Sequence, residues 1–177
     1  MTTPDYCAAG ANKPNGQYDL AVIGAGSAGF SAAIAAAEAG AYVALIGHGT
    51  IGGTCVNTGC VPSKTLIRSV EPVHLAKAAA QFTGIEADGR VRDWRAVIGQ
   101  KDALVSSLRQ TKYVDLLPSY NTIAYIAGRA RLTSDGIAVD TAVVNARKVI
   151  IATGASPALP AIPGLADVPY LTSTTAL

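Results

Sequence analysis

The sequence predicts an α/β fold in which helices cover a parallel sheet, and three observations support this prediction. An apolar segment at residues 18–23 ends in a glycine-rich turn. An alanine-rich segment at 27–39 follows it, and a second apolar segment lies at 41–46. Both apolar segments are continuously hydrophobic rather than alternating, which is typical of parallel strands covered on both faces. Strand, helix and strand in this order predict a βαβ unit.

The helix of this unit has local causes in the sequence. Alanine is the best helix former, and Gly40 supplies the end of the helix over 27–39. The run from 20 to 47 carries Glu38 as its only charge, but its glycines divide it into strand-like and helix-like parts. A buried βαβ unit therefore explains this run better than a membrane-spanning helix does.

The rest of the chain changes character along its length. Two long helices are predicted, at about 60–80 and about 93–117, and Pro118 ends the second. A small antiparallel meander is predicted from short strands at 121–127, 129–133, 136–140 and 142–145. Residues 148–152 predict another apolar strand, and four prolines make 156–170 an extended connection.

Composition limits the classes of function. The chain has 177 residues, of which 50% are hydrophobic and 15% charged, so it can build one domain with a core. A net charge of +2 with scattered Lys and Arg favours neither nucleic acid nor a membrane surface as a partner. Three cysteines are too few for a secreted disulfide framework, so we expect a cytoplasmic protein. Residues 1–17 are expected to form a flexible polar lead without a signal peptide's apolar core, and Cys7 within it is interpreted as incidental.

The glycine-rich turn has the spacing G-x-G-x-x-G and lies between a predicted strand and a predicted helix, the context that gives this motif its meaning. Gly24 permits the tight turn, Gly26 lets a pyrophosphate approach the backbone, and Gly29 lets helix and strand pack closely. The helix amides that follow, including those of Ser27 and Ala28, suit an anion. This motif predicts a dinucleotide site.

The usual acidic partner of this motif is missing. The acid normally ends the second strand and binds the ribose hydroxyls, but here that place holds Gly47, followed by His48. Losing a hydrogen bond to a charged group costs about 1.5–3 kcal/mol. We therefore expect weaker cofactor binding and predict that Gly47→Glu tightens it. His48 is interpreted as a solvent-facing turn residue.

A pair of cysteines follows in GGTCVNTGCVPSK, residues 52–64, where four residues separate Cys55 from Cys60. Gly52 and Gly53 let the backbone approach a flat ligand. A helix that begins near Cys60 would direct its positive end at that sulfur and favour the reactive thiolate. The pattern predicts a redox dithiol held against a cofactor.

Two other interpretations of the cysteines fit less well. A structural zinc site usually needs four ligands at recognisable spacings, and no such set occurs in this sequence; His74 lies 14 residues beyond Cys60 and is interpreted as a surface or packing residue. Two unrelated buried cysteines would leave the neighbouring glycines and Lys64 unexplained.

The segment 52–64 closely resembles the dithiol signature of the FAD-dependent pyridine nucleotide–disulfide oxidoreductases, and the resemblance extends over about 18–177. Within that family, IIATGASP at 150–157, IPGL at 162–165, PYLTSTTAL at 169–177 and LRQTKY at 108–113 are most similar to the mercuric reductase subfamily. The resemblance implies a Rossmann-like FAD-binding fold.

The resemblance also implies a role for each site residue. Cys60 is expected to be the flavin-proximal sulfur and Cys55 the exchange sulfur that meets substrate. Lys64 is expected near the flavin ring, where a cation favours the reduced, anionic flavin. Further cofactor contacts are implied for Gly49, Thr54, Ala130, Thr153 and Gly154.

The implied reaction passes electrons from NADPH to FAD and then to the cysteine pair. The two thiolates are soft ligands that suit Hg(II), which mercuric reductases reduce to Hg(0). In dihydrolipoyl dehydrogenase and other disulfide reductases of the family the same pair exchanges with a substrate disulfide. A non-catalytic module that binds FAD or a thiophilic metal is a third interpretation, and the dithiol signature alone does not separate the three.

The family resemblance further implies that 18–177 is the N-terminal portion of an FAD-binding domain. A homodimer is expected for the full-length enzyme, whose NAD(P)H and dimerisation domains have no counterpart in this sequence. A second G-x-G-x-x-G does not occur in it either. We therefore expect the chain by itself not to turn over.

Overall fold

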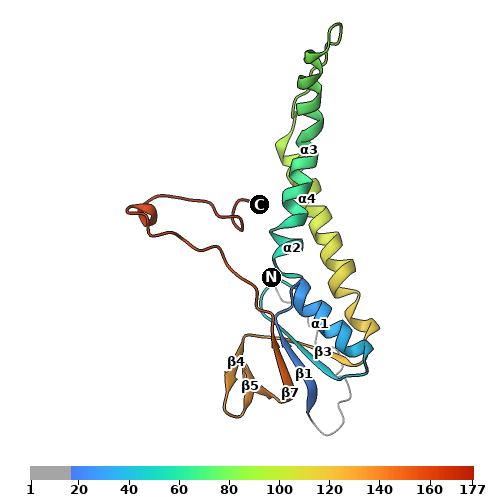
Figure 1. Cartoon of the computed structure of the whole chain (residues 1–177), viewed down its shortest axis with the longest axis vertical. Coiled ribbons are helices and arrows are strands. Elements are labelled where there is room, and N and C mark those ends of the chain that lie inside the picture. The colour runs from blue at the N-terminus through green and yellow to red at the C-terminus, as the bar shows by residue number, and fades with distance from the viewer. Residues whose placement is uncertain (1–16) are drawn as a thin grey trace.

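The computed structural model describes residues 17–177. Its centre is a four-stranded parallel sheet in the order β3-β2-β1-β7 (Figure 1). These strands are β1 (Tyr18–Ile23), β2 (Val43–Gly47), β3 (Ile123–Ala127) and β7 (Ala146–Ile151). Cys7 and nearly all of the predicted lead lie outside the described residues.

The βαβ unit predicted from the sequence is confirmed. Helix α1 (Ser27–Glu38) connects β1 to β2, and these two strands pair in parallel with Leu20 opposite Val43. Phe30 and Ala33 of α1 pack on one face of the sheet with Val22 and Leu45. Because β2 is buried along its whole length, it needs the continuous apolar sequence that it has.

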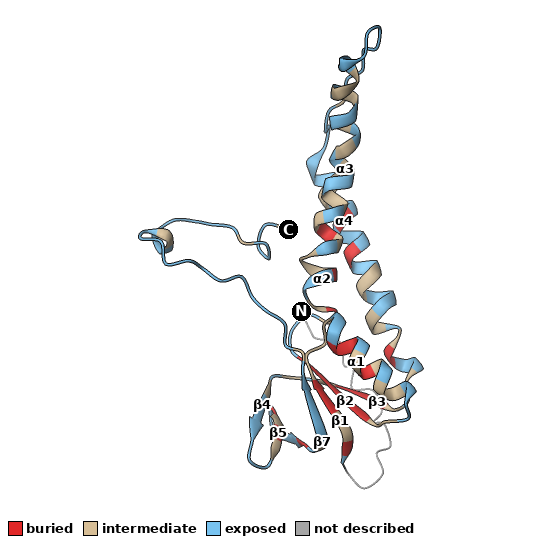
Figure 2. Ribbon diagram, in the orientation of Figure 1, coloured by how far each residue is buried: buried red, intermediate tan, exposed pale blue. Residues whose placement is uncertain are grey.

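A second, three-stranded antiparallel sheet covers the opposite face of the parallel sheet. It has the order β4-β5-β6, with β4 (Ala130–Thr133), β5 (Gly136–Val139) and β6 (Ala142–Val144). Ile137 and Val139 pack against Ala21 and Ala44 of the parallel sheet. Burial is therefore concentrated in β1, β2 and β3 and in the helix over them (Figure 2).

The assignment of 121–127 to the antiparallel meander is wrong. Strand β3 pairs in parallel with β2, with Val43 opposite Ile123 and Gly47 opposite Ala127. Although β3 is at the edge of this sheet, its apolar run is buried at its first three positions. A parallel neighbour needs a long crossover connection, which the two long helices supply.

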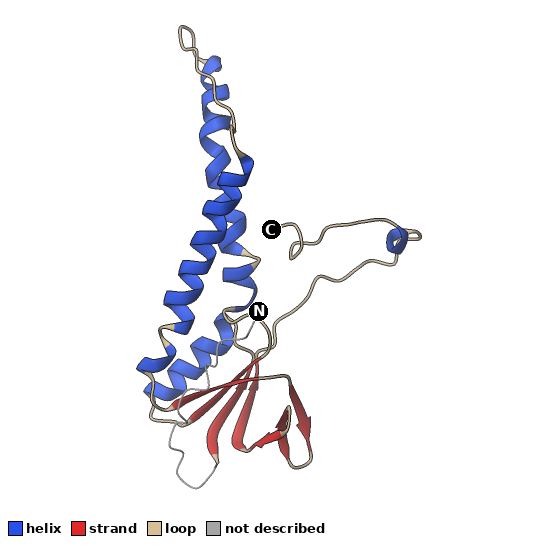
Figure 3. Ribbon diagram, turned by 180° about the vertical axis from the view of Figure 1, so that it is seen from behind, coloured by secondary structure: helices blue, strands red, loops and turns tan. Residues whose placement is uncertain are grey.

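Those helices form an antiparallel hairpin that projects away from the sheet, as Figure 3 shows from behind. They are α3 (Cys60–Ala78), which continues into a 3₁₀ turn at Ala79–Gln81, and α4 (Trp94–Arg109). Asp93 caps α4 by accepting a hydrogen bond from the Ala96 amide at 3.1 Å. The second helix is shorter than predicted, because a π turn at Gln110–Val114 replaces its end.

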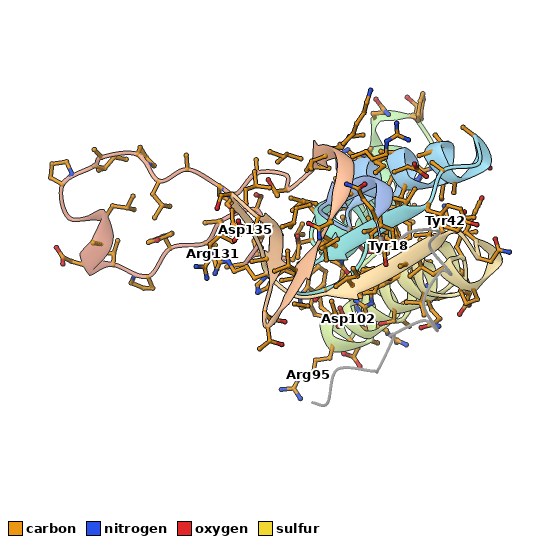
Figure 4. The ribbon with its side chains drawn as sticks, turned by 90° about the horizontal axis from the view of Figure 1, so that it is seen from below. Tyr18, Tyr42, Arg95, Asp102, Arg131 and Asp135 are labelled. Atoms are coloured by element: carbon orange, nitrogen blue, oxygen red, sulfur yellow. The ribbon has the colours of Figure 1, made fainter. Side chains whose placement is uncertain are left out.

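The connection over 156–170 is extended, as its four prolines predict. After β7 the chain leaves the sheet as an extended arm, interrupted by a 3₁₀ turn at Leu165–Asp167. Seen from below, Tyr18 and Tyr42 lie at the parallel sheet, Arg131 and Asp135 on the antiparallel sheet, and Arg95 points away from the hairpin (Figure 4). Within residues 17–177, none of the helices combines the length and apolar character needed to cross a membrane.

Candidate dinucleotide and dithiol site

The glycine-rich turn is held against two backbone segments. Gly24 has φ +121°, and a Cβ on it would lie 2.1 Å from the Ala152 carbonyl oxygen. A Cβ on Gly29 would lie 1.8 Å from the Gly24 carbonyl oxygen. Both distances are far inside van der Waals contact with backbone atoms, so the turn and the start of α1 can pack this way only with glycine.

The first turn of α1 presents backbone amides to the space beside the sheet. Gly26 is the N-cap residue, and no side chain caps the helix by a hydrogen bond. No acidic side chain lies in the first turn. Unpaired amides and the positive end of the helix dipole therefore remain available for an anion such as a pyrophosphate.

The segment 52–60, which carries both cysteines and is called the dithiol loop below, lies directly against this turn. The Gly52 amide donates a hydrogen bond to the Ala25 carbonyl at 2.9 Å, and Gly26 and Gly52 form an isolated parallel bridge. Gly53 has φ +65°, and a Cβ on it would lie 2.7 Å from the Gly26 Cα. The glycines before the cysteines therefore bring two backbones together, which places the dithiol beside the glycine-rich turn.

A cavity of about 630 Å³ joins these parts. The size is suitable for a large organic ligand. Its lining comes from the dithiol loop, from the glycine-rich turn, and from residues that follow the carboxyl ends of β2 and β3. Eleven of the predicted site residues line the cavity: Gly24, Gly26, Ser27, Ala28, Gly49, Gly53, Thr54, Cys55, Ala130, Thr153 and Gly154.

The other four predicted site residues do not line this cavity. Gly29 and Gly52 act through the close backbone packing described above. Cys60 is the first residue of α3, and Lys64 lies one turn further along the same helix. Both side chains are exposed, and the Lys64 charge lies close enough to act on the Cys55 thiol.

Cys55 and Cys60 come from two successive helices. Cys55 lies in the short helix α2 (Gly53–Asn57), and both cysteines are exposed free thiols in this structure. A hydrogen bond from the Cys55 thiol to the Cys60 sulfur raises the pKa of Cys55, and partial desolvation and the charge of Cys60 act in the same direction. The Cys60 backbone amide and the positive charge of Lys64 oppose this rise in the pKa. The ionisation of Cys55 therefore depends directly on Cys60.

Hydrogen bonds from one asparagine fix the dithiol loop. The Asn57 side-chain amide donates to the Ile51 and Gly53 carbonyls at 2.9 Å each. Arg109 of α4 in turn donates to the Asn57 side-chain oxygen at 2.9 Å. The long hairpin therefore positions the loop, a role that the sequence reasoning did not assign to either residue.

Tyr113 is a further contact that the sequence reasoning missed. It lies in the π turn, and its hydroxyl is 3.1 Å from the Ser27 hydroxyl in the glycine-rich turn. Its ring meets Phe30 edge to face, with ring centroids 4.8 Å apart. The π turn therefore ties the end of the hairpin to the start of α1, as such turns often do at functional sites.

The structure corrects the prediction made for Gly47. The residue is buried at the end of β2, and a Cβ on it would lie 2.5 Å from the Tyr125 hydroxyl and 2.7 Å from the Ala25 Cβ. Gly47→Glu must therefore displace the buried Tyr125 ring, and by itself the substitution is not expected to tighten ligand binding. His48, as interpreted from the sequence, is exposed, and it lines the cavity.

Among residues 17–177, no group of three or more His, Cys, Asp or Glu side chains could hold a metal ion. The two thiols remain a possible two-coordinate site for a soft metal ion, because thiolates are the protein ligands that such ions prefer.

The effect of Cys60 on the pKa of Cys55 can be tested by alkylation. Cys60→Ala removes the largest contribution that raises the pKa of Cys55, so we expect iodoacetamide to alkylate Cys55 several-fold faster at pH 7.5 in this variant. The alkylation rate rises because a lower pKa of the Cys55 thiol gives a larger fraction of thiolate at pH 7.5. Lys64→Ala should have the opposite effect, since the lysine charge lowers the pKa of Cys55. Peptide mass spectrometry separates the cysteines, and equal rates in all three proteins would contradict the expectation.

Comparison with known proteins decides the family. The family model described as pyridine nucleotide-disulphide oxidoreductase matches residues 18–177. The chain belongs to this family. This oxidoreductase chain is 50% identical over 161 residues to a mercuric reductase from Lysinibacillus sphaericus, covering 90% of this chain and 29% of that protein. It is 49% identical over 164 residues to a mercuric reductase from Staphylococcus aureus, covering 92% of this chain and 30% of that protein.

Solved structures of relatives agree with the family. The oxidoreductase chain matches the HOCl-induced flavoprotein disulfide reductase RclA from Escherichia coli with a TM-score of 0.69 and 32% identity. This match covers 90% of the chain and 33% of RclA. A Cu(II) complex of the same protein matches with a TM-score of 0.66 and 33% identity. The chain therefore spans about a third or less of the length of these relatives.

Proposed function

We propose that this chain is the FAD-binding portion, over 18–177, of a cytoplasmic, homodimeric enzyme that reduces Hg(II) to Hg(0) with NADPH. One observation carries the proposal: Cys55, which interacts with Cys60, lines the same cavity as the glycine-rich turn and the uncapped start of α1. Sequence identity of 50% to a mercuric reductase supports the choice of substrate.

The residues of the cavity fit FAD. Glycine backbones at the turn leave room for a pyrophosphate, and the amides of the first turn of α1 can bind it. Gly49, Thr54, Thr153 and Gly154 would line the cofactor, and Ala130 would offer backbone contacts to the adenine. When bound, FAD would supply two-electron transfer between NADPH and the cysteine pair.

The two cysteines would have different roles in the reaction. Cys60, at the start of α3, would be the sulfur next to the flavin, because the helix terminus favours negative charge there. Cys55 would meet the substrate first. Both thiolates would then bind Hg(II), and its reduction to Hg(0) consumes two electrons that NADPH supplies on becoming NADP⁺. Lys64 would supply a positive charge near the flavin ring.

A visible absorption spectrum of the purified chain with added FAD tests this proposal. We expect saturable binding of FAD and, on reduction, a long-wavelength band that Cys60→Ser abolishes. Added Hg(II) should remove the band in the unsubstituted chain, because both thiolates become metal ligands. A colourless chain that still binds Hg(II) would favour a non-catalytic binding module instead.

Reduction of a disulfide is the second candidate function, favoured by the similarity to the disulfide reductase RclA. The same thiols would then exchange with a substrate disulfide instead of binding a metal ion. NADPH oxidation by the whole enzyme that contains this chain distinguishes the two. Oxidation with Hg(II) but not with lipoamide or glutathione disulfide is expected, and the reverse pattern would overturn the choice of Hg(II).

A further inference from the structure

Tyr125 occupies the space that an acidic side chain on residue 47 would need. It lies on β3 opposite Leu45 of β2, and residues two apart on a strand share a face, so Leu45, Gly47 and Tyr125 all face α1. A Cβ on Gly47 would lie 2.5 Å from the Tyr125 hydroxyl oxygen and 2.9 Å from its ring. The tyrosine hydroxyl therefore occupies the space that a side chain on residue 47 would take.

The Tyr125 side chain is buried, and its hydroxyl reaches the cavity. The residue is 8% exposed, and burial raises the pKa of its hydroxyl, so the group stays protonated and neutral near pH 7. Within residues 17–177 this hydroxyl has no hydrogen-bond partner. Every fully enclosed side-chain polar atom in that range has a partner, so this hydroxyl is not fully enclosed. The hydroxyl must therefore reach the open cavity, which Tyr125 lines.

This part of the cavity is where a dinucleotide would place its adenosine sugar. The glycine-rich turn contacts the dithiol loop at Gly26 and contacts residue 47 at Ala25, and Tyr125 lies beside residue 47. In α/β dinucleotide sites the ribose lies just beyond the carboxyl end of the second strand, next to the pyrophosphate. Gly47 is the last residue of that strand here.

We propose that Tyr125 binds the adenosine ribose hydroxyls through its phenol group, in the place of a carboxylate on residue 47. The inference rests on the proposed binding of FAD. Gly47 and Tyr125 then form a matched pair, since the glycine leaves room for the phenol and the phenol supplies the polar contact that the glycine lacks. A neutral hydroxyl replaces a charged acceptor at the ribose.

Calorimetric titration of the full chain with two adenosine ligands tests this pairing. The probes are ADP, which carries both ribose hydroxyls, and 2′,3′-dideoxy-ADP, which carries neither. Tyr125→Phe is expected to weaken ADP binding about 3- to 10-fold, the range for one neutral hydrogen bond. It should leave the affinity for 2′,3′-dideoxy-ADP unchanged, so the two ligands should become equivalent. The dissociation constant of FAD should rise by the same factor as that of ADP.

Tyr42→Phe is the matched control, because Tyr42 precedes β2 at the opposite end of the strand from Gly47 (Figure 4). It should alter neither affinity. An equal loss for both ligands in Tyr125→Phe would assign the tyrosine a purely structural role and overturn the inference. Unchanged ADP and FAD binding in Tyr125→Phe would also overturn it, while leaving the proposed function intact. If the unsubstituted chain binds neither FAD nor ADP, the proposed function fails and the inference fails with it.

A paired replacement gives a second, independent measurement. Gly47→Glu alone must displace the tyrosine, so we expect weaker ADP binding. Gly47→Glu combined with Tyr125→Val removes the clash with the tyrosine and leaves the contact with the Ala25 Cβ at 2.7 Å, so the double variant should bind ADP more tightly than Gly47→Glu alone. If the double variant binds ADP as weakly as Gly47→Glu alone, the two residues are not exchangeable and the inference is wrong.

Discussion

Gly29→Ala is expected to lower the free energy of unfolding by about 3 kcal/mol and to abolish FAD binding. The added Cβ would lie 1.8 Å from the Gly24 carbonyl oxygen, and Gly24 is itself held against the Ala152 carbonyl. Neither backbone segment can move without disturbing β1 or β7, so the loss should reach the upper end of the usual range for overpacking. Urea denaturation followed by circular dichroism measures the stability, and flavin fluorescence measures the binding.

Gly99→Ala is the control for this substitution. Gly99 lies inside α4, and a Cβ there would meet nothing within 4 Å. Alanine is favoured over glycine inside a helix by about 0.5–1 kcal/mol, so this variant should be slightly more stable and should bind FAD normally. An unfolding midpoint of Gly29→Ala equal to that of the unsubstituted chain would contradict the close packing of the turn.

The second large effect concerns the thiols. Replacing either Cys55 or Cys60 by serine is expected to weaken Hg(II) binding by about 10²- to 10⁴-fold, because the second thiolate binds as an intramolecular ligand at high effective concentration. The structural basis of this expectation is that Cys55 and Cys60 lie in successive helices and that Cys60 acts directly on the pKa of Cys55. Competition with a small monothiol, followed by ultraviolet absorption, gives the relative affinities.

Cys7→Ser is the matched control, since it removes a cysteine that the sequence assigns no role. It should leave the Hg(II) affinity unchanged. Single serine variants at residues 55 and 60 that bind Hg(II) as tightly as the unsubstituted chain would show that the pair does not act as one site.

Much of the site could be predicted from the sequence because its parts are local. The glycine-rich turn joins adjacent elements, so its spacing alone places a helix terminus at the end of a strand. The two cysteines are close in sequence, and the start of α3 at Cys60 agrees with the position of Pro62 inside the first helical turn. Helix α1 and strand β2 follow directly from alanine content and continuous apolar sequence.

Contacts between distant segments could not be predicted in the same way. Strand β3 was placed in the wrong sheet, because a short apolar run has the same local pattern in either sheet and only its neighbours distinguish them. The contacts of Tyr113 with Ser27 and of Arg109 with Asn57 join residues separated by 86 and 52 positions. No local spacing rule reports such pairs.

The sequence by itself determined the family of this protein, and it predicted a glycine turn for a dinucleotide with a dithiol beside it. Only the tertiary structure decided what the missing acid at Gly47 means. In the sequence that glycine is a lost contact, whereas in the fold a tyrosine from the neighbouring strand fills its place. The physical reason is that a side chain's space is set by its neighbours across the sheet, which lie far away in the chain.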